Sequence, residues 1–406
     1  MKRAPRKLLT ITLPALAVTI VVLMAAAEVW VRASFDPKRG TPGFFLGDPM
    51  RGQRLAPNYT GWFAGVPVHI NSLELRDDRE YALDKKPSTF RILFLGDSVT
   101  FGHGSVAEHA YPALLERLLR EWRPDVDWQV WNAAVPGYNT SQELAHLLQV
   151  GPAFQPDLVV IGFFPNDLVA NYTVVPAGRM ARVASAVTSF LRRHMYSLEL
   201  YKRVFLTLQW KLSGNDEYHK RLDLLGTEDE LTVKVDQIVD LKEQQITEYD
   251  RFTDEQMYGL KCWSGQMPKP TQIQQMKSAP GWPAWIAAVR ELQKLHTSGA
   301  YSILFFLNEV PLPCPNGDSF YDYGLRQEND LFVGIMGEGT PVFSVFDTFL
   351  HRRPSQMPGA TAHSIGNANM TKAEALFGYL KTELFPRLRV PALAASGRPP
   401  TSGPRP

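Results

Sequence analysis

The sequence predicts a three-layer α/β domain in which helices cover both faces of a parallel β-sheet. Its 406 residues are 45% hydrophobic and 11% aromatic, so the chain can bury a full core. Disordered, collagen-like and small disulfide-rich classes of protein are thereby excluded. From residue 90 onward, short apolar runs rich in β-branched and aromatic residues alternate with stretches of helical periodicity. That alternation is typical of a parallel sheet buried on both faces.

An uncharged stretch near the N-terminus predicts a membrane-spanning helix. Residues 8–27 carry no charge, and as a helix they would be about 30 Å long, the thickness of a bilayer's hydrocarbon core. We therefore expect a cytoplasmic stub and signal anchor over residues 1–30, with the rest of the chain periplasmic or extracellular. The basic residues before the stretch favour this orientation: Lys2, Arg3, Arg6 and Lys7.

The alternative to an anchor is a signal peptide whose cleavage would leave a secreted protein. Ala25, Ala26 and Ala27 are small residues, of the kind found at a cleavage site. The apolar stretch is longer than the usual hydrophobic region of a signal peptide. Its length favours the anchor.

The sheet domain is expected over residues 90–390, behind an irregular but packed lead-in at residues 31–89 that is rich in Gly, Pro and Asn. Parallel sheets bind ligands beyond the carboxyl ends of their strands, so functional residues are expected there. Buried strands are predicted at residues 90–95, 128–131, 158–163, 302–306 and 342–346, and amphipathic helices at residues 111–122, 141–150 and 282–296.

Residues 169–281 interrupt this alternation and are predicted to be a helical insertion, because no strand-like run occurs in them and charged helical stretches dominate. Near its start, residues 180–206 mix apolar residues with arginine and lysine. This composition is compatible with a lid or a membrane-facing helix, although an amphipathic helix docked on its own domain is the commoner case. Residues 391–406 end in a Pro- and Gly-rich sequence and are expected to be a disordered tail.

The first predicted strand leads into a turn that can present a nucleophile. Its sequence runs Gly96-Asp97-Ser98-Val99-Thr100-Phe101-Gly102, and small residues around a serine allow its side chain and backbone N–H to face a substrate. Taken alone, the turn is equally well explained as an ordinary strand-to-helix connection with a capping residue.

Two further strand ends favour the catalytic interpretation of Ser98. Gly137 follows the second strand and can offer a backbone N–H unshielded by a side chain, while Asn166 follows the third and carries a side-chain amide. Together with the Ser98 amide they would form an oxyanion hole, in which each donor is worth about 3 kcal/mol of transition-state stabilisation. Three such residues at successive ends of one sheet indicate an active site.

These residues resemble the SGNH (GDSL-type) hydrolase superfamily, through Ile92 to Gly102 with Gly137 and Asn166 at their offsets. The chain is most similar to membrane-anchored bacterial members with an upstream Asn-Ser-x-x-x-Arg-Asp element, here residues 71–77. The resemblance is tight over residues 90–167, loose over residues 282–384, and does not cover the insertion. It implies a flavodoxin-like, five-stranded sheet of order 2-1-3-4-5, ester chemistry through Ser98, and a base histidine near the C-terminus.

The resemblance identifies His363 as that base, ten residues before Ala373 in the last predicted helix. The family usually carries an Asp three residues before this His and an Asn two residues after it, whereas this chain has Ala360 and Ile365. Another group must then orient the imidazole. Asp347, at the end of the fifth predicted strand, is the nearest substitute, although a solvated or capping residue is the commoner role there.

Charge and composition restrict the partners that we expect. With 43 Lys and Arg against 41 Asp and Glu, the formal charge is +2, which provides no drive toward nucleic acid. We expect no metal, because His-x-x-x-His and acidic calcium-loop motifs are absent from the sequence, and the chemistry requires no cofactor. Cys262 and Cys314 can form one disulfide outside the cytoplasm or remain buried thiols.

These observations predict a membrane-anchored serine hydrolase acting on an ester. Ser98 would attack and form an acyl-enzyme, His363 would transfer its proton, and the Ser98 amide, Gly137 and Asn166 would bind the oxyanion. The expected substrates are O-acyl groups of an envelope carbohydrate, or a lipid ester near the membrane. Two alternatives remain open, namely an O-acyltransferase on a surface polysaccharide and a non-catalytic envelope protein that retains the fold.

Overall fold

A five-stranded parallel sheet forms the centre of the computed structural model, which describes residues 6–36, 40–168, 174, 177–215, 272–308, 323–349, 367–388 and 390–391. The strands lie in the order β6-β5-β7-β8-β9, so the predicted order 2-1-3-4-5 is confirmed. Their bounds are β5 Thr89–Gly96, β6 Asp127–Asn132, β7 Leu158–Phe163, β8 Ile303–Leu307 and β9 Val342–Ser344.

Strand β5 is buried along its whole length, since β6 and β7 pair with its two edges and helices cover both faces. Its alternate residues enter two different cores, as the pleat of a strand requires. Phe90, Ile92 and Phe94 pack on one side, whereas Leu93 and Leu95 pack on the other. This two-sided burial explains why the strand is an uninterrupted apolar run.

Helices form the two outer layers. Helices α3 (Tyr111–Trp122) and α14 (Asn367–Tyr379) pack against each other on one face, and α14 continues into a wider turn, η5 (Leu380–Leu384). The other face is covered by α4 (Thr140–Phe154), α11 (Trp282–Thr297) and α12 (Tyr323–Met336). The predicted three-layer α/β architecture is therefore confirmed. Several connections between these elements contain short helices: α2 (Ser98–Phe101), η2 (Ala107–His109), η3 (Pro165–Leu168) and α13 (Phe346–Phe349).

The lead-in segment is more regular than the sequence predicts. It contains two antiparallel hairpins, β1 (Phe45–Asp48) with β2 (Gly52–Leu55) and β3 (Tyr59–Phe63) with β4 (Val66–Ile70). Strands of four or five residues separated by tight turns leave little periodicity to detect, which explains the difference. The hairpins share a core with Phe101, Val135 and Tyr138, so they pack against the loops at the carboxyl edge of the main sheet.

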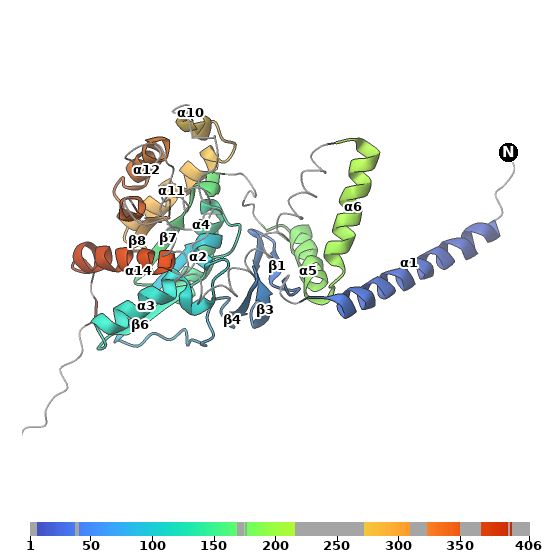
Figure 1. The fold of residues 1–406 in the computed structure, drawn as a ribbon, viewed down its shortest axis with the longest axis horizontal. Coiled ribbons are helices and arrows are strands. Elements are labelled where there is room, and N and C mark those ends of the chain that lie inside the picture. Colours follow the sequence, from blue (N-terminus) through green and yellow to red (C-terminus); the bar gives the residue numbers. More distant parts are fainter. Residues whose placement is uncertain are drawn as a thin grey trace, which may run out of the picture.

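Helix α1 (Arg6–Ser34) projects away from the sheet domain (Figure 1). Its residues Thr12–Ser34 have a mean hydropathy of 2.1 and none of their apolar window is buried in the protein, so the helix is long and apolar enough to cross a bilayer. The described part of the insertion is helical as predicted, with α5 (Arg179–His194), α6 (Leu198–Ser213) and α10 (Gln272–Lys277). Cys262, Cys314 and the end of the tail lie outside the described residues.

Candidate active site

Ser98 opens a short helix directly beyond the carboxyl end of β5. Asp97 precedes it as the N-cap of α2, and Asp97 Oδ1 accepts a hydrogen bond from the Val99 N–H at 2.8 Å. Ser98 is partly exposed, whereas the next three residues of α2 are buried. The turn thus presents one hydroxyl at the edge of the sheet while its other side chains enter the core.

Two glycines allow α2 to lie directly on the strand ends. Gly96 of β5 pairs with Gly162 of β7, and Thr100 packs over both. A Cβ atom would lie 2.3 Å from Thr100 Oγ1 at Gly96 and 2.0 Å from the same atom at Gly162. Any side chain at either position would therefore displace the helix that begins with Ser98.

Asn166 is held against the Ser98 turn by a buried carboxylate. It lies in η3, after β7, and its side chain is exposed. Asn166 Nδ2 donates a hydrogen bond to Asp97 Oδ2 at 2.8 Å. Because a side-chain amide has two N–H groups, this bond positions the amide and leaves a second donor at the edge of the sheet.

Gly137 lies in the turn after β6 and is exposed. Its φ of +82° is in the left-handed region, which a glycine adopts without steric cost. The turn is fastened on two sides, because the Val135 N–H donates to the Gly96 carbonyl at 2.9 Å and Gln53 Nε2 donates to the Pro136 carbonyl at 3.0 Å. Gly137 and Asn166 therefore lie beyond the two strands that flank the Ser98 strand, as the sequence predicts.

The remaining predicted residues are not brought to this turn by the described structure. His363 and Ala360 lie outside the described residues. Asp347 is exposed in the first turn of α13, after β9. Since β9 is three strands away from β5 in the sheet, the two strand ends are about 14 Å apart, and an imidazole would have to lie between them for Asp347 to orient it.

A fully buried lysine lies beneath the Ser98 turn, and sequence reasoning missed it. Lys372 of α14 is completely buried, and Lys372 Nζ has no hydrogen-bond partner among the described residues. Burial lowers its pKa to about 7, against the opposing attraction of Asp97. Asp97 is itself fully buried, and this raises its pKa, while the Asn166 amide and Lys372 act in the opposite direction.

A signal for Lys372 was present in the sequence. Ala368, Lys372, Leu376 and Leu380 follow one another at four-residue spacing, and all four are buried on one side of the same helix. A lysine on an apolar stripe is unusual, because a buried charge requires a partner. It indicates a buried polar site.

Two further buried carboxyl groups, Glu143 of α4 and Asp167 of η3, lie close enough to Asp97 to interact with it electrostatically. Burial raises the pKa of both Glu143 and Asp167 well above the usual range, and their mutual repulsion and that of Asp97 act in the same direction. Asp167 Oδ2 accepts a hydrogen bond from Thr140 Oγ1 at 2.8 Å, whereas neither carboxyl oxygen of Glu143 has a hydrogen-bond partner among the described residues. Burial therefore favours the neutral form of both carboxyl groups over the charged form.

The upstream element at residues 71–77 has a structural role at the site. Arg76 is buried, and its guanidinium donates to the backbone carbonyls of Phe101, Gly102 and Ser105. It also lies over the Phe101 ring at 4.2 Å. Asn71 shapes the turn before it, because Asn71 Oδ1 accepts hydrogen bonds from the Leu73 and Leu75 N–H groups at 3.0 Å. The element thus holds the loop that follows α2.

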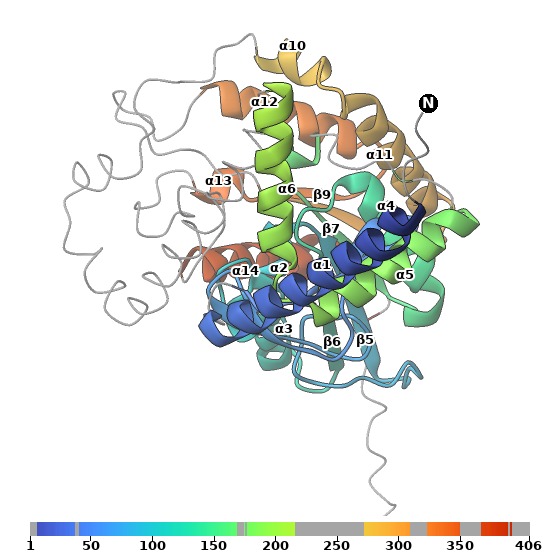
Figure 2. The same ribbon diagram turned by 90° about the vertical axis from the view of Figure 1, so that its right-hand side faces the viewer.

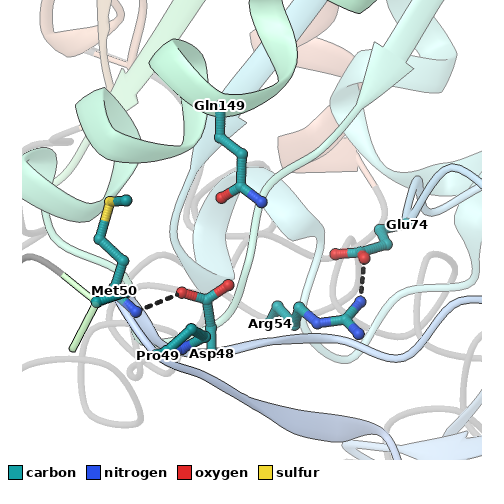
Figure 3. A pocket seen from close by; sticks show the side chains of 7 residues that line it. Asp48, Pro49, Met50, Arg54, Glu74 and Gln149 are labelled. Atoms are coloured by element: carbon teal, nitrogen blue, oxygen red, sulfur yellow. Dashed lines mark hydrogen bonds and ion pairs between the residues drawn. The ribbon is translucent and has the colours of Figure 1, made fainter. Parts of the chain in front are cut away.

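A separate cleft of about 630 Å³ opens between the first hairpin and α4 (Figure 3). Arg54 and Glu74 form an ion pair along its wall, and Asp48 Oδ1 accepts from the Met50 N–H at 2.9 Å. Ser98, Gly137 and Asn166 do not line it. Its lining residues are Asp48, Pro49, Met50, Arg54, Glu74, Gln149 and Ala177. Within the described ranges, no group of three or more His, Cys, Asp or Glu residues is placed to hold a metal ion.

Part of the chain is similar to known ester hydrolases. Residues 94–233 match the GDSL-like Lipase/Acylhydrolase family. An arylesterase of Vibrio mimicus is 38% identical over 77 residues, which are 19% of this chain and 38% of that protein. The chain therefore aligns with about two fifths of the length of that curated relative.

Solved structures with a similar fold include two hydrolases. One is a catalytic mutant of Axe2, an acetylxylan esterase from Geobacillus stearothermophilus, with 15% identity, a TM-score of 0.34, and coverage of 73% of this chain and 95% of that chain. The other is a GDSL-like lipase from Bacteroides thetaiotaomicron, with 10% identity, a TM-score of 0.31, and coverage of 76% and 93%. The stretch that matches the GDSL-like Lipase/Acylhydrolase family, residues 94–233, includes the Ser98 turn, Gly137 and Asn166.

Proposed function

We propose that the protein is a serine esterase that hydrolyses ester bonds through an acyl-enzyme on Ser98. The observation that carries the proposal is the bond from Asn166 Nδ2 to Asp97 at 2.8 Å, which holds an amide donor beside the partly exposed Ser98. The match of residues 94–233 to the GDSL-like Lipase/Acylhydrolase family and the similarity to an arylesterase support ester chemistry.

In this mechanism the Ser98 hydroxyl attacks the ester carbonyl. The negative charge on the carbonyl oxygen is stabilised by N–H donors arranged before the reaction, namely the Ser98 amide, the Gly137 amide and the second N–H of Asn166. The first turn of a helix supports this role, because its N–H groups have no acceptor within the helix and its dipole favours negative charge.

His363 is proposed as the base that takes the Ser98 proton and returns it to the leaving alcohol. Water then hydrolyses the acyl-enzyme. The proposed substrates are O-acyl groups on an envelope carbohydrate or lipid esters near the membrane, because α1 is able to hold the domain at a bilayer. Transfer of the acyl group to a sugar hydroxyl would use the same intermediate with a different acceptor.

The test uses the full-length protein in detergent with p-nitrophenyl esters of short and medium chain length. Ser98→Ala and His363→Ala should each abolish nearly all turnover, and the double variant should be no worse than either one, because nucleophile and base act as a unit. Ser141→Ala is the matched control, since Ser141 is a serine of α4 whose hydroxyl makes only a long contact of 3.4 Å to the Ala284 carbonyl.

A fluorophosphonate probe separates hydrolysis from a non-catalytic fold. It should label the wild type and the Ser141→Ala variant but not Ser98→Ala. Wild-type turnover in Ser98→Ala would overturn the proposal. Labelled protein that turns over no ester in water, but does so when a sugar acceptor is added, would identify acyl transfer instead of hydrolysis.

A further inference from the structure

The end of the apolar helix α1 is fastened to the junction between α5 and α6. The Glu28 carboxylate accepts hydrogen bonds from the Tyr196 N–H at 3.0 Å, the Ser197 N–H at 2.9 Å and the Ser197 hydroxyl at 2.6 Å. Arg32 Nη2 donates to the His194 carbonyl at 2.6 Å. The junction between α5 and α6 is therefore fixed next to Glu28 and Arg32, so the depth of α1 in a bilayer would also determine the depth of this junction.

The first turn of α6 contacts α1 at a point deeper than Glu28, the first charged residue after the uncharged stretch 8–27. Tyr201 Oη donates to the Met24 carbonyl at 3.0 Å, and Met24 lies one turn before Glu28, about 6 Å deeper along α1. Residues 8–27 are uncharged, so the apolar part of a bilayer around α1 would end near Glu28. The first turns of α6 then lie within the boundary region of that bilayer.

The side of α6 that carries Tyr201 continues as an exposed apolar face. Its members repeat at three- and four-residue spacing and so share one side of the helix. They are Val204, Phe205, Leu208 and Leu212, which are 50%, 59%, 53% and 86% exposed. Four large apolar side chains in a row on one helix indicate a partner other than water.

Helix α5 has a docked side and an exposed apolar side. Ser189 Oγ accepts from the Gly47 N–H of β1 at 2.9 Å, and Ser185 is in close contact with the same glycine. Roughly half a turn away around the helix, a second apolar row faces solvent. It consists of Met180, Val183, Val187 and Phe190, each at least 54% exposed.

We propose that these two apolar rows form a membrane-docking surface that lies in the surface of the bilayer crossed by α1, against anionic phospholipid headgroups. Residues 179–213 contain seven Arg and Lys and one Glu, a charge that complements an anionic surface. Contact with α1 makes the surface continuous with the membrane span. Both docking helices lie on the side of the domain from which α1 projects (Figure 1), and α6 stands in front of the sheet domain when seen from that side (Figure 2).

Docking in this way would hold the catalytic edge of the sheet near the lipid. Helix α5 packs on β1, and the core of the hairpins includes Phe101 and Val135, which belong to the loops carrying Ser98 and Gly137. One layer of hairpins therefore separates the docking surface from the site. The proposal makes the two interpretations of residues 180–206 compatible, because α5 is docked on its own domain by one side and would face lipid with the other.

The test is made on the full-length protein in vesicles of phosphatidylcholine and phosphatidylglycerol. Nitroxide labels are attached to single cysteines, Val187→Cys, Phe190→Cys, Phe205→Cys or Leu208→Cys, in a Cys262→Ala, Cys314→Ala background. Leu148→Cys is the matched control, because Leu148 is 51% exposed on helix α4 of the sheet domain. Labels on the docking surface should collide more with oxygen than with a water-soluble nickel chelate, and the Leu148 label should show the reverse.

Several outcomes would overturn the proposal. Labels at the four test positions that behave like the Leu148 label would place the surface in water, and spin–spin broadening between identical labels would assign it to a second copy of the chain. Replacing phosphatidylglycerol with phosphatidylcholine should shift the test labels toward water, so unchanged immersion would exclude the anionic headgroups. A second experiment uses the wild type and serves if the cysteine-free protein does not fold. A photoactivatable phosphatidylcholine in the vesicles should form crosslinks within residues 179–213. Crosslinks confined to residues 6–34 would refute docking.

Discussion

Asn166 Nδ2 and Asp97 Oδ2 lie 2.8 Å apart and join the carboxyl ends of two neighbouring strands. Asp97 is completely buried, so its carboxyl group has a fixed position, and the Asn166 amide takes its orientation from it. A donor that is oriented before the substrate arrives does not have to reorganise during the reaction, which is the physical basis of oxyanion stabilisation. In the proposed mechanism the pair would act as one unit, in which Asn166 contacts the substrate and Asp97 is its positioning residue.

Replacing Asn166 should reduce the rate more than it reduces substrate binding. Asn166→Ala removes a donor used mainly in the transition state, so kcat should fall about 10²–10³-fold, or about 3 kcal/mol, with little change in KM. Steady-state kinetics on a p-nitrophenyl ester measure this. Asn215→Ala, at an exposed amide after α6, is the control, and a variant of Asn166 that changes KM alone would contradict the assignment.

Lys372 should make stability depend on pH in a definite direction. Its pKa is lowered from 10.5 to about 7, so between these values the unfolded chain binds a proton that the folded protein has released, and stability rises with pH. Below pH 7 the folded protein carries the full cost of a buried ammonium. Lys372→Met should therefore be more stable than the wild type at pH 6, by about 1–4 kcal/mol, and this advantage should shrink toward pH 10.

Thermal unfolding of both proteins across this pH range measures the effect. Glu374→Gln, two residues away on the exposed side of α14, is the matched control and should not reproduce the effect of Lys372→Met. An advantage of Lys372→Met that is the same at pH 6 and pH 10 would mean that Lys372 does not titrate in the folded protein.

Gly162 of the parallel sheet and Gly334 of α12 provide a matched pair of Gly→Ala substitutions, one into a packed site and one into open space. Gly162→Ala places a Cβ atom 2.0 Å from Thr100 Oγ1, so it should destabilise the domain by about 1–3 kcal/mol and lower kcat by shifting the Ser98 turn. Gly334→Ala meets nothing within 4 Å on the exposed side of α12 and should stabilise by about 0.5–1 kcal/mol. Adding Thr100→Ala should partly restore Gly162→Ala, and equal effects at both glycines would refute the packing argument.

The acid that orients His363 can be identified by two opposite substitutions. If the site is an unsupported Ser–His dyad, Ala360→Asp should raise kcat, because losing the orienting acid costs about 10⁴-fold in a serine protease triad. If Asp347 has taken over the role, Asp347→Asn should lower kcat instead. One imidazole N–H is satisfied by one acceptor, so only one of these outcomes is expected. Unchanged rates in both variants would mean that a backbone carbonyl or water orients the base.

The sheet and the position of the Ser98 turn were predictable from the pattern of residues, and the strand order from the family resemblance. Buried parallel strands are continuous apolar runs, as residues 90–95 and 158–163 are, because both faces of the sheet are covered. Residues at the carboxyl ends of such strands must share one edge, so Ser98, Gly137 and Asn166 could be placed together without coordinates. The hairpins at residues 45–70 were missed, since their strands are too short to show a period.

Local sequence therefore determined which residues reach the catalytic edge, whereas only the tertiary structure decided what holds them there. Asp97 and Lys372 are 275 positions apart in the chain, and no local pattern relates them. Burial is what shifts the pKa of each of them, and Asp97 in turn orients Asn166 through a hydrogen bond. The proposed membrane-docking surface is a second case. The apolar rows on α5 and α6 can be related to the apolar helix α1 only because Glu28 and Met24 contact Ser197 and Tyr201, which lie far along the chain. Secondary structure follows from the periodicity of near neighbours, while desolvation and long-range hydrogen bonds arise only when the chain has folded.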